Sequence, residues 1–175
     1  MNLKISAWSA IANAIIVIPL FVIGFIAMSK PEVTSLTYSF IFLSLISVVI
    51  GILIIMGFIT LANFTKNKFL RNMAFIFIIV AIIASGIEVF TMFQTLAVFD
   101  IVILILIGII SILFGISVLK LKEAFGGIVT ALGVLYIIEG VFEITIILTL
   151  LVPLTTIIIS VLEAIFFFRA SKKYD

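Results

Sequence analysis

The chain has 175 residues, of which 66% are hydrophobic and 10% are charged, and it carries a net charge of +2. Soluble domains are about 45 to 50% apolar and about 25% charged, so this composition excludes an ordinary water-soluble domain. The chain contains no Cys and no His, which excludes disulfides, thiolate chemistry and the commonest metal and haem ligands. We therefore expect a lipid bilayer as the main partner, and neither a metal nor a cofactor.

Apolar runs long enough to cross a bilayer recur along the chain. A hydrocarbon core about 30 Å thick needs about 20 helical residues. The first run follows Lys4 and is longer than a signal-peptide core of about 7 to 15 residues, so we predict a membrane helix there. Charged or helix-breaking residues separate most of the later runs. The sequence predicts an all-α bundle forming one transmembrane domain over residues 1–175, with six helices near 7–28, 36–63, 73–97, 100–119, 125–148 and 152–168.

The basic residues are distributed unevenly between the two sides of this six-span arrangement. They cluster at the ends of apolar runs and form no continuous face, so we expect no nucleic-acid partner. Nine of the ten Lys and Arg residues fall on one side of the membrane, and only Lys30 falls on the opposite side. Because an excess of Lys and Arg in short loops marks the cytoplasmic side, we predict a cell-membrane protein with both termini in the cytoplasm. The basic residues on the predicted cytoplasmic side are Lys4, Lys66, Lys68, Arg71, Lys120, Lys122, Arg169, Lys172 and Lys173.

Glycines are spaced so that two of the predicted helices can approach closely. Helix association in a membrane depends on small residues and on polar side chains that bond across helices. Gly108 and Gly115 share a stripe on the fourth predicted helix, while Gly126, Gly133 and Gly140 recur every seven residues on the fifth. This spacing favours a left-handed crossing, and we expect the two helices to pack along their glycines. The alternative is that Gly is simply frequent in membrane helices.

Acidic residues inside the predicted spans are the main chemical feature of the sequence. No Lys, Arg or His shares their depth. Inserting an ionisable residue near the centre of a span costs about 2.5 to 3.5 kcal/mol, so four cost about 10 to 14 kcal/mol. Without an internal base, these carboxyls must be protonated, share protons, face water or hold a cation. The four residues are Glu88, Glu139, Glu143 and Glu163.

Helical geometry groups several of these side chains. Glu139 and Glu143 are one turn apart on the same face, about 6 Å along the axis, and Tyr136 continues that face. The face flanks the glycine stripe of the same helix and should point into the bundle. Glu88 and Glu163 each share a helix face with Ser and Thr side chains. We predict that the four glutamates and Tyr136 form a proton- or cation-binding site serving transport.

Two other interpretations of the glutamates stay open. They could be permanently protonated and join helices by hydrogen bonds worth about 0.6 to 2 kcal/mol each, in a structural or accessory subunit of a membrane complex. Some could instead face a membrane subunit that supplies the base this chain lacks at that depth, and a mixture of Glu and Phe also suits a ligand cation through cation–π contacts. The possible protein partners are a second copy of the chain, in a homo-oligomer, or such a membrane subunit. An enzyme is the least expected class, because the sequence offers no pairing of a nucleophile with a base.

Overall fold

The structure is a computed structural model. In the part of the chain that it describes, all regular elements are helices, which confirms the predicted all-α fold. It describes residues 2–29, 33–91, 97–145 and 147–174, and within them it leaves out the side chains of residues 28, 88–91, 97–100, 147 and 149. The elements are α1 (Leu3–Ser29), α2 (Thr34–Phe64), α3 (Lys68–Thr91), α4 (Ala97–Leu119), α5 (Lys122–Phe125), α6 (Gly127–Ile144), η1 (Ile147–Leu151, a 3₁₀ helix) and α7 (Val152–Tyr174).

Six of these helices are long and apolar enough to cross a membrane, all except the short α5 and η1. The shortest of the six, α6, has 18 residues, which rise about 27 Å at 1.5 Å per residue. This length is close to the thickness of a bilayer core. The chain is therefore a multi-pass integral membrane protein, and each predicted span corresponds to one long helix.

The fifth span differs from its prediction. The sequence predicts a helix over 125–148, whereas α6 ends at Ile144. The hydroxyl and the backbone N–H of Thr145 both donate to the carbonyl oxygen of Val141, at 2.6 and 3.0 Å. Thr145 belongs to a run of β-branched residues, which weakens the helix locally. Because this run is as apolar as the helix before it, hydrophobicity alone did not reveal where α6 ends.

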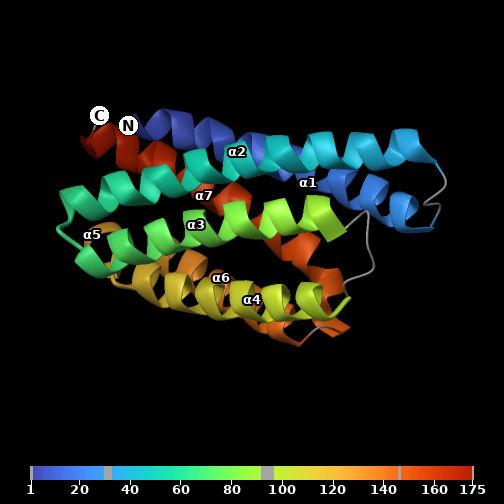
Figure 1. The fold of residues 1–175 in the computed structure, drawn as a ribbon. Coiled ribbons are helices and arrows are strands. Elements are labelled where there is room, and N and C mark those ends of the chain that lie inside the picture. The colour runs from blue at the N-terminus through green and yellow to red at the C-terminus, as the bar shows by residue number, and fades with distance from the viewer. Residues whose placement is uncertain (1, 30–32, 92–96, 146, 175) are drawn as a thin grey trace.

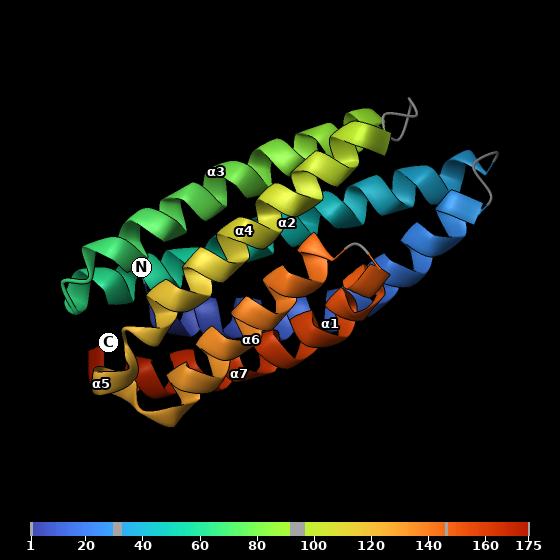
Figure 2. The same ribbon diagram turned by 90° about the horizontal axis from the view of Figure 1, so that it is seen from below.

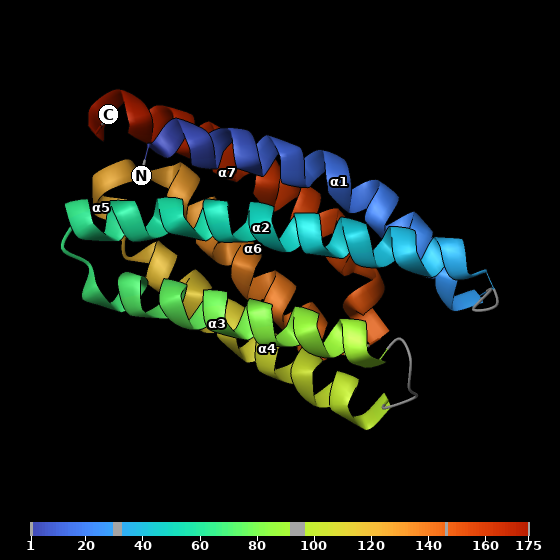
Figure 3. The same cartoon turned by 45° about the horizontal axis from the view of Figure 1, so that its top comes forward.

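The six long helices form a ring in chain order. Each packs against the helix before and after it along the chain, and α7 closes the ring against α1. Figures 1 and 3 show α1 beside α7, and Figure 2 shows α3 beside α4 and α6 beside α7. The two termini lie at one end of the ring, together with α5 and the turn between α2 and α3 (Figure 1). We call this end the terminal end.

Basic residues gather at the terminal end. The turn from α2 to α3 contains Lys66 with a left-handed φ of 54°, and the side-chain oxygen of Asn67 then accepts the N–H of Leu70 at 3.0 Å to begin α3. The other basic side chains of the predicted cytoplasmic group lie in the first turns of α1 and α3, the connection from α4 to α6 and the last two turns of α7. All of these segments lie at the terminal end (Figure 1).

Four phenylalanines fill the inside of the ring of helices, between the middle of the bundle and the terminal end. We call Phe58, Phe114, Phe166 and Phe167 the aromatic layer, and all four are fully buried. The centroid of the Phe58 ring lies 5.2 Å from that of Phe114, 6.0 Å from that of Phe166 and 5.0 Å from that of Phe167. Such ring pairs contribute about 0.5 to 1.5 kcal/mol each beyond their burial, so the layer joins α2, α4 and α7 through Phe58.

We expect Phe58→Ala to lower the free energy of unfolding by about 3 to 5 kcal/mol, because it removes the ring that contacts the rest of the aromatic layer. Reversible unfolding in mixed detergent micelles measures this change. Phe42→Ala is the matched control, since Phe42 lies on the same helix with 64% of its surface exposed. Equal stability losses in the two variants would contradict the packing described for the layer.

Helices α4 and α6 approach closely at four of the predicted glycines. A Cβ atom built on Gly108 would lie 2.6 Å from the carbonyl oxygen of Gly140, and one built on Gly115 would lie 2.6 Å from that of Gly133. Both distances are too short for a side chain, so the two backbones meet where only glycine fits. Gly126 does not take part, contrary to expectation, because it lies in the turn before α6 with φ 73° and open space around its Cβ position.

Candidate functional site

Three of the four predicted membrane glutamates line the inside of the ring. Glu139 and Glu143 project from α6 and Glu163 projects from α7. Their side chains are 9%, 9% and 2% exposed. The side chain of Glu88, on α3, lies outside the described residues, so its place in the predicted site stays a prediction.

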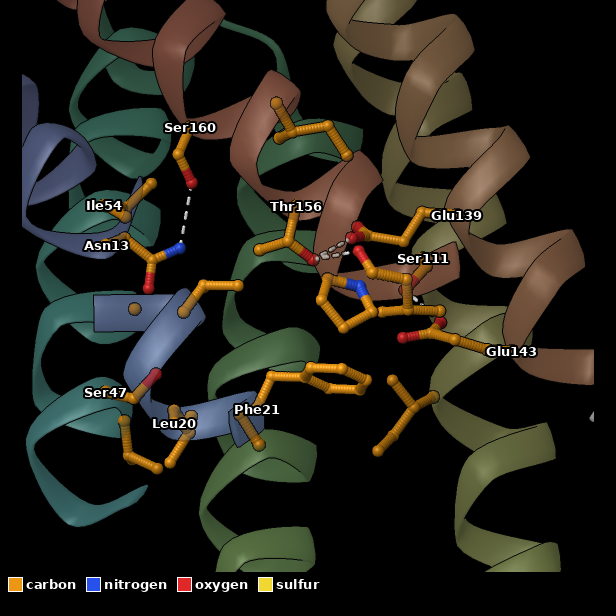
Figure 4. A pocket seen from close by; sticks show the side chains of 18 of the residues that line it. Asn13, Leu20, Phe21, Ser47, Ile54, Ser111, Glu139, Glu143, Thr156 and Ser160 are labelled. Atoms are coloured by element: carbon orange, nitrogen blue, oxygen red, sulfur yellow. Dashed lines mark hydrogen bonds between the residues drawn. The ribbon is translucent and has the colours of Figure 1, made fainter. Parts of the chain in front are cut away.

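Two hydrogen bonds in opposite directions join α6 to α7. The hydroxyl of Tyr136 on α6 donates to Oε1 of Glu163 on α7. The hydroxyl of Thr156 on α7 donates to Oε1 of Glu139 on α6 at 2.5 Å (Figure 4). Tyr136 therefore contacts the acidic group as the sequence predicts, and each of these two carboxyls is held by a hydroxyl from the neighbouring helix.

The third carboxyl is held from α4. The hydroxyl of Ser111 donates to Oε2 of Glu143 at 3.0 Å (Figure 4). Ser111 lies between Gly108 and Gly115 on α4, and Glu143 lies one turn from Gly140 on α6. The close glycine contact between the two helices therefore brings a short serine side chain within reach of a carboxyl on the facing helix.

The second oxygens of two carboxyls are available for a further hydrogen bond. They are Oε1 of Glu143 and Oε2 of Glu163, the second oxygens of carboxyls that each accept one hydroxyl. Both side chains line a cavity. The sequence has no Lys, Arg or His between Lys122 and Arg169, so neither α6 nor the membrane part of α7 supplies a base. These oxygens are free to accept a hydrogen bond or a positive charge from a ligand.

The cavity has a volume of about 720 Å³ and is lined by all six long helices. The cavity extends from the middle of the ring of helices toward the end opposite the terminal end. The aromatic layer lies between the cavity and the terminal end. Figure 4 shows Glu139 and Glu143 across the cavity from Asn13 and Ser47. Asn13 donates from its side-chain amide to the hydroxyl of Ser160 at 2.9 Å, which adds a polar link between α1 and α7. Apart from such polar groups, the lining is apolar.

Several residues that build this site were not predicted from the sequence. Ser111 on α4 and Thr156 on α7 each donate a hydroxyl to a carboxyl on α6, and the sequence alone did not indicate either bond. The spacing of Thr156, Ser160 and Glu163 at i, i+4 and i+7 marks one polar face of α7, which was the available signal. Nothing in the sequence indicated that α1 and α2 would form the opposite wall.

The carboxyls in this arrangement can bind small positive charges. A carboxyl can bind a proton or pair with a cation, and the hydroxyl that donates to its other oxygen suits either state. In a medium of low dielectric constant, an ionised carboxylate without a counter-charge is costly, so each ionised group needs a positive partner. The site therefore has groups that can bind a proton or a cation.

Comparisons with known proteins give no relative for this chain. No family model matches it, and neither the curated proteins nor the solved structures contain a significant match.

Proposed function

We propose that the protein transports a cation across the membrane in exchange for a proton, with Glu139, Glu143 and Glu163 as the coupling site and Tyr136 as a hydroxyl that positions Glu163. The observation that supports this proposal is that three buried carboxyls without a basic partner line one cavity inside a ring of membrane helices. Carboxyls at this depth are typical of ion and proton pathways in transporters.

The physical basis is a competition for the same negative charge. A proton and a cation can each neutralise a carboxylate inside the membrane, and binding of one disfavours the other. If the cavity faces the two sides of the membrane in turn, release of one ion to a compartment is linked to uptake of the other. Three carboxyls allow a cation to be bound while the remaining groups keep their protons.

The distribution of basic residues suggests how the cavity is oriented. We propose that the terminal end faces the cytoplasm of a cell membrane, because nine of the ten Lys and Arg residues belong to its segments. The cavity then occupies the outer half of the bundle, and the aromatic layer lies between it and the cytoplasm.

A second candidate function is that of a structural or accessory subunit of a membrane complex. The hydrogen bonds between helices are the observation that favours it. Each of the three carboxyls accepts a hydroxyl from another helix, as a permanently neutral interhelical link would. Three such bonds contribute about 2 to 6 kcal/mol, against an insertion cost of about 8 to 11 kcal/mol for three glutamates. Because the bonds do not offset that cost, we prefer a role that uses the carboxyl chemistry.

The infrared bands of the carboxyls in reconstituted liposomes separate the two candidates. We expect at least one band to titrate between about pH 4 and pH 9 and to disappear in the matching Glu139→Gln, Glu143→Gln or Glu163→Gln variant. We also expect proton flux driven by a cation gradient, and loss of that flux in the same variant. Bands that stay neutral over the whole range, together with no flux, would overturn the transport proposal and leave the structural role.

A further inference from the structure

We infer that the cavity binds a lipophilic organic cation, with the positive charge of the ligand against the carboxyls of α6 and α7 and its apolar body against α1, α2 and α3. This inference rests on the proposed transport function and specifies the class of cation. It is argued from the size, the lining and the charge of the cavity.

The size of the cavity fits a small organic molecule. Pockets that hold such ligands have volumes of about 300 to 1,000 Å³, and this cavity has about 720 Å³. A bare metal ion instead needs several oxygen ligands within about 2.6 Å. No three acidic side chains among the described residues are close enough together to hold one metal ion. The carboxyls are spread along a wall, which suits a wider ligand.

The lining of the cavity suits a ligand with an apolar body. Aromatic rings from four helices contribute to it, and those that face the glutamates from the other helices include Phe21 on α1, Phe40 on α2 and Phe77 on α3. Figure 4 shows the Phe21 ring pointing into the space between α1 and the glutamates. Aromatic faces attract organic cations, and the aliphatic lining favours an apolar ligand through the area it buries.

The charge of the cavity selects for a cation. Its lining includes three acidic residues and no basic residue among the described part of the chain. The hydroxyls of Ser111 and Tyr136 donate to Oε2 of Glu143 and to Oε1 of Glu163, so the second oxygen of each buried carboxyl can accept a positive charge from a ligand. An anion of the same shape would meet these oxygens without any compensating group. The cavity should therefore distinguish ligands of equal size by the sign of their charge.

Two probes of nearly the same shape test this selection. We expect the purified full-length chain in detergent to bind tetraphenylphosphonium saturably and to bind tetraphenylborate at least about tenfold more weakly, with binding to protein-free micelles subtracted. Equilibrium dialysis measures both affinities. Glu143→Gln should weaken phosphonium binding and narrow the difference between the two probes.

A pair of glycine variants tests whether binding occurs in the cavity. Gly51 lines the cavity, and a Cβ atom built on it meets nothing within 4 Å, so Gly51→Trp should fill the space and weaken phosphonium binding at least about tenfold. Gly86 also has open space at its Cβ position but is exposed and is not among the lining residues, so Gly86→Trp should bind as the wild type does. Gly51→Leu replaces the Trp variant if that variant does not elute as a single species.

The outcomes separate this inference from the proposed function. Equal binding of both probes, or binding unaffected by Gly51→Trp and Gly51→Leu, would overturn the organic-cation site. Absence of phosphonium binding, with proton flux still driven by an inorganic cation gradient, would overturn the substrate class and leave transport in place. Absence of binding, flux and carboxyl titration together would overturn both proposals.

Discussion

Glu163→Gln is expected to lower cation-driven proton flux in proteoliposomes by at least about tenfold. Glu163 is the least exposed of the three carboxyls, at 2%. It lies about one helical turn from Phe166 and Phe167 of the aromatic layer on α7. A Gln amide oxygen can still accept the hydroxyl of Tyr136, so the contact between α6 and α7 is retained. The amide can neither exchange a proton nor neutralise a cation, and the expected loss is therefore one of coupling.

Two further variants make this result interpretable. Glu123→Gln makes the same substitution at an exposed position on α5 and should leave flux unchanged. Tyr136→Phe removes the hydroxyl that donates to Glu163 but leaves the carboxyl of Glu163 in place. We therefore expect a smaller loss of flux than in Glu163→Gln. The coupling role of Glu163 would be contradicted if Glu163→Gln transported at the wild-type rate while eluting as the same folded species.

Gly140→Ala is expected to lower the free energy of unfolding by about 1 to 3 kcal/mol, although it adds a single methyl group. That carbon would lie 2.5 Å from the carbonyl oxygen of Gly108 and 3.0 Å from the backbone nitrogen of Ile112. Backbone atoms of a packed helix cannot move aside as a flexible side chain can, so α4 and α6 must separate. Reversible unfolding in mixed micelles measures the loss.

The same substitution at Gly86 should not lower the free energy of unfolding. Gly86 lies in α3 with open space around its Cβ position, so Gly86→Ala should leave stability unchanged or raise it by up to about 1 kcal/mol through helix propensity. Separation of α4 from α6 should also weaken the bond from Ser111 to Glu143, and the infrared band of Glu143 should shift in Gly140→Ala alone. A Gly140→Ala protein as stable as Gly86→Ala would contradict the close backbone contact.

Much of the fold could be predicted from the sequence because the bilayer imposes a simple requirement. Each crossing needs a long apolar helix, and each break needs a polar or backbone cue. Strong cues such as Lys66 and Lys68 marked the end of α2 correctly. The run after Glu143 offered no such cue, and there the predicted helix extended past the true end of α6.

The site was predictable in its acids and less so in their surroundings. Charge inside an apolar span is conspicuous in one sequence, so Glu139, Glu143 and Glu163 were identified without knowledge of packing. Which hydroxyl each carboxyl accepts depends on the rotation and separation of neighbouring helices. Thr156 therefore bonds Glu139 on another helix, although the sequence places it near Glu163 on its own helix. The cavity wall from α1 and α2 likewise depends on ring closure between distant parts of the chain.

The aromatic layer also limits the kind of transport that the proposed function allows in this conformation. Its four phenyl groups offer no oxygen or nitrogen that could replace the hydration shell of an ion, and their rings are in contact across the ring of helices. A permeating ion would have to leave its water at this level and gain nothing in exchange. Among the described residues, the aromatic layer therefore lies between the cavity and the terminal end, and we expect no continuous pore through this conformation. Passage to the terminal end requires the helices that carry these rings to move apart, so turnover should be limited by a conformational step that is slower than diffusion through an open channel.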